Sequence, residues 1–217
     1  MKFWDVVKEM CAQPVRQEAG RLFVLGLAGH PEAVIAARKE VLGNAAGAEL
    51  AAAEPFLCTA SPPYSAEMES RLRHADLLVS LPGGPGLTDF RPADTIQVEH
   101  LADLQKSVLT HRPDLRVAIA RRLPGFRSLA ADLVIKDVSR VNAEFAAIST
   151  LTQAIPGIAP WFPVVAGADI FLLTKNQALL IFRLAAIYGE ELDLKSRARE
   201  VAPVIGGAFG WRTIARE

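Results

Sequence analysis

Two glycines near the start of the chain stand where the backbone could hold a phosphate group. Gly26 ends the apolar run Leu22–Gly26, and Gly29 and His30 follow just before a helical pattern. A loop between a strand and a helix directs several backbone N–H groups and the positive end of a helix dipole toward one point. The spacing predicts an anion-binding loop or, as the plainer interpretation that we favour, a tight turn shaped by its glycines.

The residues that follow the loop lack the chemistry of nucleotide hydrolysis. In a working phosphate-binding loop, a lysine reaches the terminal phosphates and a serine or threonine binds magnesium. Aligned from Gly26, the second glycine becomes Pro31, the lysine becomes Glu32 and the hydroxyl residue becomes Ala33. Proline has no N–H to donate, glutamate repels phosphate, and alanine offers magnesium no ligand. No cofactor is expected, with GTP or another nucleotide kept as the alternative ligand.

Short apolar runs along the first half of the chain predict the elements that carry this loop. The runs do not alternate with polar residues, which indicates strands buried on both faces of a sheet. Helix-length sequence separates them, including a helical pattern over 98–108, so the strands are expected to be parallel and joined by crossover helices. We therefore expect a doubly wound, mainly parallel α/β domain. The predicted strands are Leu22–Gly26, Phe56–Thr59, Leu77–Leu81 and Leu115–Ile119.

Two further segments are expected at the carboxyl edge of this sheet, where open α/β sheets bind ligands. Leu81–Gly86 is rich in glycine and proline and follows the third predicted strand. Arg121 and Arg122 follow the fourth, and could bind a phosphate or carboxylate in place of the missing lysine. For both segments we favour the interpretation that involves no ligand, which is a wide turn at Leu81–Gly86 and a solvated basic turn at Arg121 and Arg122.

The second half of the chain has a different character. No glycine or proline occurs between Phe126 and Ile155, and apolar residues recur there at spacings of four and three, which predicts one long helix. We place an N-terminal amphipathic helix at 1–19, the α/β domain at 20–126 and an apolar helical hairpin or bundle at 127–217. The last residues stop inside a helix-like pattern without a capping signal, which leaves open whether the chain continues past Glu217. The predicted stripe is Val134, Val138, Val141, Phe145 and Ile148.

A polar seam runs along the apolar segment of the final third. Asp169, Asn176 and Arg183 fall within about 40° of one another at helical periodicity. The favoured interpretation is a central helix whose seam is hydrogen-bonded across the bundle. The alternatives are a membrane-associated or membrane-spanning helix with the seam facing another helix, and a surface for self-association or for a protein partner.

Composition excludes several classes of function. The 24 basic and 24 acidic residues balance, so no long-range field attracts DNA or RNA, and no nucleic-acid partner is expected. The 2 cysteines and 4 histidines show no metal-binding spacing. The start of the chain has no uninterrupted apolar core of a secretion signal. A cytoplasmic location is expected, with the inner face of the cell membrane as the alternative.

Two stretches resemble a known family of proteins. Arg21–Gly43 is similar to the opening of the small Era-like GTPases in its apolar strand, glycine loop and helix. A second set of segments resembles the hydrophobic domain of unknown function that follows a GTPase or GTPase-like domain in an uncharacterised bacterial family. Together the stretches cover about half of the chain. The second set includes Val141–Ala146, Ile155–Gly157, Ala168–Asp169, Leu173–Gln177 and Ile187–Gly189.

The resemblance implies a GTPase-like fold but not GTPase activity, because the family's motifs are degenerate. Ser80 stands at the position of the switch aspartate, unless Ala75–Val79 matches the following strand and the switch is missing altogether. Arg121–Gly125 stands where the guanine-reading N-K-x-D is expected. We therefore expect a non-catalytic scaffold or adaptor that acts through its apolar helices, and not an enzyme. A nucleotide- or phosphometabolite-binding protein and an integral membrane component are the alternatives.

Overall fold

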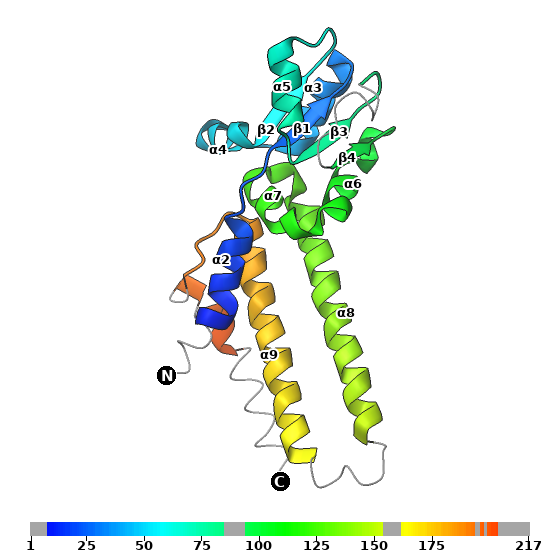
Figure 1. The fold of residues 1–217 in the computed structure, drawn as a ribbon. Helices are drawn as coiled ribbons and strands as arrows, with labels where there is room; N and C mark the ends of the chain where they lie inside the picture. The colour runs from blue at the N-terminus through cyan, green and yellow to red at the C-terminus, as the bar shows by residue number, and fades with distance from the viewer. Residues whose placement is uncertain (1–7, 85–93, 154–161, 194–195, 198, 204–217) are drawn as a thin grey trace. The chain divides into compact units, whose positions relative to one another are not determined.

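The computed structural model describes residues 8–84, 94–153, 162–193, 196–197 and 199–203 of the 217-residue chain. The chain divides into two compact units, whose elements are labelled in Figure 1. The α/β unit comprises Glu18–Ala130 with Ile187–Gly189, and the helical unit comprises the described residues of 1–17, 131–186 and 190–217.

The α/β unit is built on a four-stranded sheet with all strands parallel, in the order β2-β1-β3-β4 (Figure 1). Leu25 of the central strand lies opposite Leu57 on one side and Leu77 on the other. The expected α/β architecture with a parallel sheet and a helical C-terminal region is confirmed. The strands are β1 (Leu25–Ala28), β2 (Leu57–Ala60), β3 (Leu77–Ser80) and β4 (Thr95–Gln97). The helices of this unit are α3 (Pro31–Leu42), α4 (Gly47–Ala53), α5 (Ala66–Arg73), α6 (Leu104–His111) and α7 (Arg116–Arg122).

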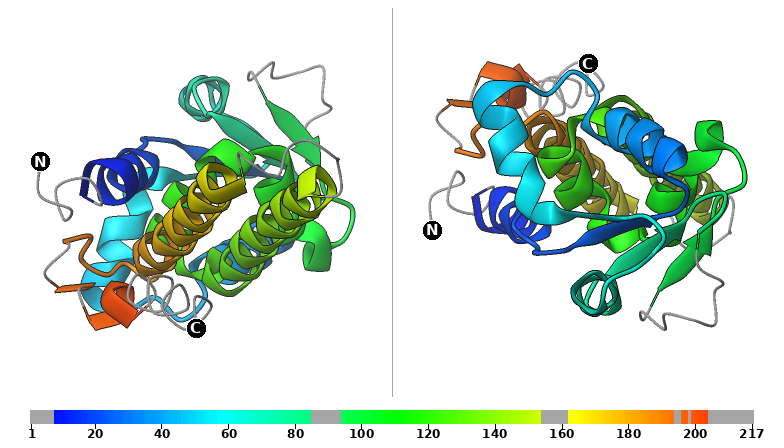
Figure 2. Two further views of the ribbon diagram at one scale, coloured as in Figure 1. Left: turned by 90° about the horizontal axis from the view of Figure 1, so that it is seen from below. Right: turned by 90° about the horizontal axis from the view of Figure 1, so that it is seen from above.

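Helices α3 and α5 cover opposite faces of the sheet. The chain passes from β1 through α3 to β2, and then through α5 to β3 on the other side of β1. Because parallel crossovers are right-handed, this change of direction moves the second helix to the other face, as Figure 2 shows. All residues of β1 and β3 are buried, which explains why their sequences are continuously apolar.

Small residues let α5 approach the sheet closely. A Cβ atom on Gly26 would lie 3.0 Å from Cδ1 of Leu78 and 3.4 Å from Cδ2 of Leu72. Ala28 and Cys58 belong to the same buried cluster as these leucines. Gly26 therefore serves packing inside β1 and lies outside the loop in which the sequence placed it, because the strand is shifted toward the C-terminus.

The ends of α3 follow the chemistry of helix termini. Pro31 occupies the first turn, where its missing N–H leaves no hydrogen bond unmade. Gly43 ends the helix with φ at 57°, a conformation that favours glycine, and its N–H donates to the carbonyl of Lys39 at 2.8 Å. The residue types at both ends therefore fit the boundaries of the helix.

The run Leu115–Ile119, predicted to be the fourth strand, is not a strand. It forms the end of a 3-10 turn and most of α7. Its residues are all buried, including Arg116, whose guanidinium donates to the carbonyl of Leu109 at 3.4 Å. A continuous apolar run of this length has the same appearance in a buried strand and in a buried helix.

The actual fourth strand is β4, which pairs with β3 through Leu78 opposite Thr95. Its 3 residues are too few to show a periodic pattern in the sequence. The helix predicted over 98–108 is found as α6, which begins and ends later than expected and is preceded by a 3-10 turn at Leu101–Asp103.

The helical unit contains α8 (Arg127–Gln153) and α9 (Phe162–Ile187), which run side by side (Figures 1 and 2). The long helix predicted from the absence of glycine and proline is confirmed over its described residues. Pro163 lies in the first turn of α9, a position that proline tolerates. The N-terminal part of the unit consists of a π-helical turn (Lys8–Ala12) and α2 (Gln13–Ala19).

The buried face of α8 is rotated from the predicted stripe. Val134 and Val138 are buried as expected, but Val141 is 46% exposed. Asn142 is half-buried, and its Oδ1 accepts a hydrogen bond of 2.8 Å from Nδ2 of Asn176 on α9. A side-chain hydrogen bond thus joins the two helices.

The N-terminal helix is held in the helical unit by contacts to α9 and to the segment after it. The Cys11 thiol donates to the carbonyl of Lys175, with a distance of 3.9 Å from Sγ. Arg16 donates to the carbonyl of Leu192 at 2.7 Å and lies 3.8 Å from the carboxylate of Asp193.

Several predictions fall on parts of the chain outside the described residues. They concern residues 1–7 of the N-terminal helix, Pro85 and Gly86, residues 155–157 of the family resemblance, the side chain of Asp169, and the end of the chain over residues 209–217. Within the described residues, no helix has both the length and the hydropathy needed to cross a membrane.

Candidate functional site

The strand order places a candidate ligand site between the loops that follow β1 and β3. The chain leaves β1 toward β2 on one side and returns to β3 on the other, so the two loops diverge from neighbouring strands. Open α/β sheets bind ligands in the crevice at such a reversal, outside the carboxyl ends of the strands. Here the crevice lies between Gly29–His30 and Leu81–Gly84.

The backbone donors of the first loop are already used by the protein. The N–H of Gly29 donates to the carbonyl of Ala60 at 3.2 Å, and the N–H of His30 donates to the carbonyl of Pro82 at 3.0 Å. These bonds continue the parallel ladders beyond the ends of the strands. A phosphate in this loop would have to displace both carbonyls, which would then lose their donors in a buried setting.

The glycines of both loops allow the loops to touch each other. A Cβ atom on Gly29 would lie 2.7 Å from the Cβ of Leu81. A Cβ atom on Gly84 would lie 2.5 Å from the carbonyl oxygen of Ala28. Gly83 has φ at 70° and lies against His30. The loop after β3 therefore packs into the space that a ligand of the loop after β1 would need.

A hollow of about 330 Å³ remains at the carboxyl ends of β3 and β4. It is lined by Ser80–Gly84 and by Gln97–Glu99. Glu99 contributes the charge on this lining, and Ser80 is only 5% exposed. The hollow therefore suits a neutral or cationic group better than a phosphate.

The N-terminus of α3 adds no attraction for an anion beyond its dipole. His30 precedes the helix without a capping bond from its side chain, Pro31 lacks an N–H, and Glu32 places a carboxylate in the first turn. A carboxylate at this end is favourable for the helix, because it interacts with the positive end of the dipole. The same charge repels a phosphate at that end.

Arg121 and Arg122 lie away from this edge, because the segment expected to be the fourth strand is α7. The Cζ atom of Arg122 lies 4.9 Å from the ring centroid of Phe56. Phe56 immediately precedes β2, and its ring packs against Phe23 before β1 at 5.2 Å between centroids. Arg122 thus lies at the amino edge of the sheet, and a four-residue strand of about 13 Å separates that edge from Gly29.

The arginines of this region form a half-buried basic group. Arg127, at the start of α8, makes a 2.7 Å ion pair with Glu49. The pKa of Arg121 is lowered from its usual value, first by burial and then by the positive charges of Arg122 and Arg127. The structure does not bring any of them to His30, so they do not replace the lysine missing from the glycine loop.

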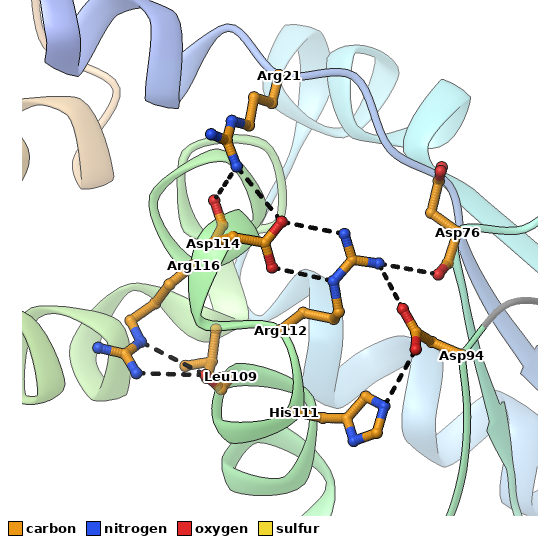
Figure 3. A network of polar contacts seen from close by, with 8 residues as sticks. All are labelled: Arg21, Asp76, Asp94, Leu109, His111, Arg112, Asp114 and Arg116. Carbon is orange, nitrogen blue, oxygen red and sulfur yellow. Dashed lines mark hydrogen bonds and ion pairs between the residues drawn. The ribbon is translucent and has the colours of Figure 1, made fainter.

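The densest polar network also lies at the amino edge, and it holds the strand entrances together (Figure 3). Arg112 makes two hydrogen bonds to the carboxylate of Asp114, at 3.0 and 3.1 Å, and one of 2.9 Å to Asp94 before β4. It also donates to the carbonyl of Asp76 before β3 at 3.2 Å. Arg21, just before β1, donates to Asp114 at 3.3 Å.

Asp76 completes this network by accepting from the N–H of Val24 at 2.7 Å. The hydrogen bond from Arg112 is the main reason why the pKa of Asp114 is lowered and that of Arg112 is raised. These carboxylates are satisfied by arginines and backbone groups of the same unit. The network is therefore structural.

In the helical unit, the structure resolves part of the predicted polar seam. Asn176 faces α8 and is bonded to Asn142, as the interpretation with bonds across the bundle expected. Arg183 is partly buried on α9, and the side chain of Asp169 lies outside the described residues. Asn176 therefore makes one hydrogen bond inside the unit, and its role in binding another protein stays a prediction.

The cysteines and histidines add no further site. Cys11 and Cys58 are each 3% exposed, and burial raises the pKa of both thiols. Within the described part of the chain, no group of three or more metal-binding side chains comes together.

The chain matches no protein-family model, no curated protein and no solved structure.

Sequence reasoning missed the residues on which this geometry depends. Ala60 and Pro82 accept hydrogen bonds from the N–H groups of Gly29 and His30 through their main-chain carbonyls. Every residue type has such a carbonyl, so the amino-acid sequence does not reveal these contacts. Asn142 could have been found as the polar residue that follows the stripe position Val141. Arg112 and Asp114 could have been suspected from their spacing around Pro113, but their partner Asp94 is distant in sequence.

Proposed function

We propose that the chain is a non-catalytic scaffold or adaptor, with a GTPase-like α/β unit that has lost its nucleotide site and a helical unit that binds another protein chain. The family resemblance of the sequence motivates the first part of this proposal. The apolar helices motivate the second.

One observation carries the loss of the nucleotide site. The N–H groups of Gly29 and His30, which would cradle a phosphate, donate to the carbonyls of Ala60 and Pro82. The side-chain changes at Glu32 and Ala33 remove the lysine and hydroxyl chemistry, and the main-chain bonds remove the cradle itself. The two losses are independent, so restoring the side chains alone would not restore the site.

The charges near the crevice support the same conclusion. Glu32 lies at the start of α3 and Glu99 lines the hollow beside it. Arg122, the sequence-based substitute for the lysine, stacks on Phe56 at the other edge of the sheet. A triphosphate would meet negative charge without a compensating cation among the described residues of the hollow.

The helical unit offers apolar surface for a second chain. Ile135 and Val141 of α8 are 41% and 46% exposed. Leu179, Leu180 and Leu184 of α9 are only partly buried. Apolar side chains on neighbouring helices are typical of surfaces that become buried by association.

The nucleotide part is tested by thermal unfolding of the purified chain with and without about 1 mM Mg²⁺–GTP, a concentration at which even weak binding shifts the melting temperature. The wild-type chain and the variant Glu32→Lys with Ala33→Ser are both expected to show no shift. Turnover of GTP or ATP by the wild-type chain, or a shift that depends on the restored lysine, would contradict the loss of the cradle.

The scaffold part is tested by light scattering after gel filtration and by crosslinking. Ile135→Glu and Val141→Glu are expected to reduce association of the helical unit, because each buries a charge in the contact. The matched control is Ile35→Glu, since Ile35 on α3 of the α/β unit is 70% exposed. Equal effects of all three variants would show that the helical unit is not the interface.

A further inference from the structure

Strand β4 is an edge of the sheet that the described chain leaves without a neighbour (Figure 1). The sequence suggested another strand at Leu115–Ile119, after the helix that follows β4, but those residues are buried in the turn before α7 and in α7 itself. No described segment pairs with the outer side of β4. An unpaired edge presents backbone donors and acceptors that another strand can use.

The hydrogen bonds to β3 show which backbone groups point outward. Asp94 accepts through its carbonyl from the N–H of Leu78 at 2.9 Å, and Val98 donates to the carbonyl of Ser80 at 2.9 Å. Backbone groups of alternate residues point to the same side of a strand. The N–H and carbonyl groups of Thr95 and Gln97 therefore point away from β3.

A groove of about 730 Å³ runs along this edge, between β4 and α6. On one side it is lined by Ile96–His100. On the other side it is lined by Asp103, just before α6, and by one face of α6, where Lys106, Ser107, Thr110 and His111 recur at helical spacing. His111 lies 3.6 Å from the carboxylate of Asp94 (Figure 3), so the end of α6 lies at the start of β4.

The charges along the groove are unevenly placed. Glu99 and Asp103 stand at the end of the groove that follows the carboxyl end of β4, and both are exposed. Neither has an ion-pair partner among the described residues, and Lys106 one turn further along α6 has none either. The two carboxylates at this end make no ion pair within the described residues, so they are complementary to a basic side chain of a ligand.

We propose that the groove between β4 and α6 binds an extended peptide segment of another protein, which pairs with β4 and places a lysine or arginine between Glu99 and Asp103. Main-chain hydrogen bonds to an edge strand supply affinity in this mode of recognition, and side-chain pockets supply specificity. The site lies in the α/β unit, so it is independent of the association through the helical unit proposed above.

The short length of β4 limits the strength of the interaction. Thr95 and Gln97 together offer two donors and two acceptors, and Gln97 is the one of the two that lines the groove. A dissociation constant on the order of 10 to 100 μM is expected, since the contact is small compared with a standard protein interface.

The experiment is a selection of displayed random peptides of about ten residues on the immobilised full chain. The affinities of the selected peptides are then measured for the wild-type chain, for Gln97→Pro and for the matched control Gln97→Thr. Proline removes the outward N–H without touching the bonds to β3, and threonine retains that N–H. We expect the dissociation constant of the selected peptides to rise about tenfold or more for Gln97→Pro, relative to the wild-type chain. For Gln97→Thr it should stay within about twofold of the wild-type value.

A second variant keeps the test valid if Gln97→Pro is poorly folded. Glu99→Lys with Asp103→Lys changes exposed residues only and reverses the charge of the acidic end. Selection on the wild-type chain should enrich lysine and arginine at one peptide position, and selection on this variant should enrich aspartate and glutamate there. An unchanged preference for basic residues would overturn the proposal.

Two further outcomes would also overturn it. One is a failure to select any peptide whose affinity depends on the Gln97 N–H. The other is self-association of the wild-type chain that Gln97→Pro abolishes, because the occupant of the edge would then be a second copy of the chain.

Discussion

Nδ2 of Asn176 on α9 donates a hydrogen bond of 2.8 Å to Oδ1 of Asn142 on α8. Both amides are half-buried. A polar pair of this kind can fix the register of two helices, because any shift along the axis leaves both amides without a partner.

The first prediction concerns this pair. Asn176→Leu is expected to lower the free energy of unfolding by about 1 to 2 kcal/mol, since it leaves the Asn142 amide without its partner. The double variant Asn142→Leu with Asn176→Leu should recover most of that loss, because no polar group remains at the contact.

Urea unfolding of the single and double variants measures the coupling between the two residues. The neighbouring Gln177 is exposed, so Gln177→Leu is a control that should change the free energy by less than about 0.5 kcal/mol. A double variant as unstable as the single one would mean that the hydrogen bond is not the cause.

The second prediction concerns the pH dependence of the α/β unit. The hydrogen bond from Arg112 lowers the pKa of Asp114 below its usual value. A lowered folded pKa gives stability that is present above the unfolded pKa of about 3.9 and is lost as the pH falls through the folded value. The Asp114 side chain is 46% exposed, so the effect is reduced by solvent screening.

The melting temperature measured between pH 2.5 and 6 should therefore fall less steeply on the acid side in Asp114→Asn than in the wild-type chain. Asp103→Asn is the control, because the exposed Asp103 carboxylate has no ion-pair partner among the described residues. Identical acid profiles for wild type and Asp114→Asn would show that the network in Figure 3 does not contribute through this carboxylate.

The third prediction separates steric overlap from backbone strain at two glycines. A Cβ atom on Gly84 would lie 2.5 Å from the carbonyl oxygen of Ala28, so Gly84→Ala should cost about 2 to 3 kcal/mol. Gly47 has φ at 54°, and a Cβ atom there would have no described neighbour within 4 Å, so Gly47→Ala should cost only about 1 kcal/mol.

Urea unfolding of the two variants gives these free energies. If Gly84→Ala were no more costly than Gly47→Ala, the loop after β3 would not be packed against β1. The carboxyl edge would then have room for a ligand, and the proposed loss of the nucleotide site would lose its main support.

The fourth prediction uses the cysteines to follow the units separately. Cys11 lies in the helical unit and Cys58 in the α/β unit, and burial raises the pKa of both thiols. In Cys58→Ser and Cys11→Ser variants, the remaining thiol should react at pH 8 at least about 100-fold more slowly than an unfolded thiol.

A cysteine introduced at the exposed Ser139 of α8 provides the control for an accessible thiol. Labelling rates as a function of urea then report the opening of each unit on its own. Equal rates at all urea concentrations would show that the units open together, and rapid labelling of either buried cysteine in water would contradict its burial.

Much of the architecture can be predicted from local sequence. The runs that became β1, β2 and β3 are continuously apolar because both faces of the sheet are covered, and helix-length segments between them require parallel pairing. Likewise, α8 follows from the absence of glycine and proline, and Pro31 and Gly43 mark the ends of α3. In each case the interactions that determine the element act between residues that are close in the chain.

The candidate site was only partly predictable. Its position after β1 and β3 follows from the order of elements. Whether its N–H groups can bind a ligand depends on Ala60 and Pro82, whose carbonyls accept hydrogen bonds from Gly29 and His30. Carbonyl groups are the same in every residue type. Their effect appears only when strands distant in sequence are paired.

The amino-acid sequence by itself determined the class of fold, the absence of a lysine and a hydroxyl residue just after Gly29, and the apolar character of α9. Tertiary structure alone decided that Leu115–Ile119 lies outside the sheet, that Arg122 lies at the amino edge, and that no described segment pairs with the outer side of β4. A buried apolar run satisfies its backbone equally well as helix or strand, so the choice depends on the neighbours that cover it.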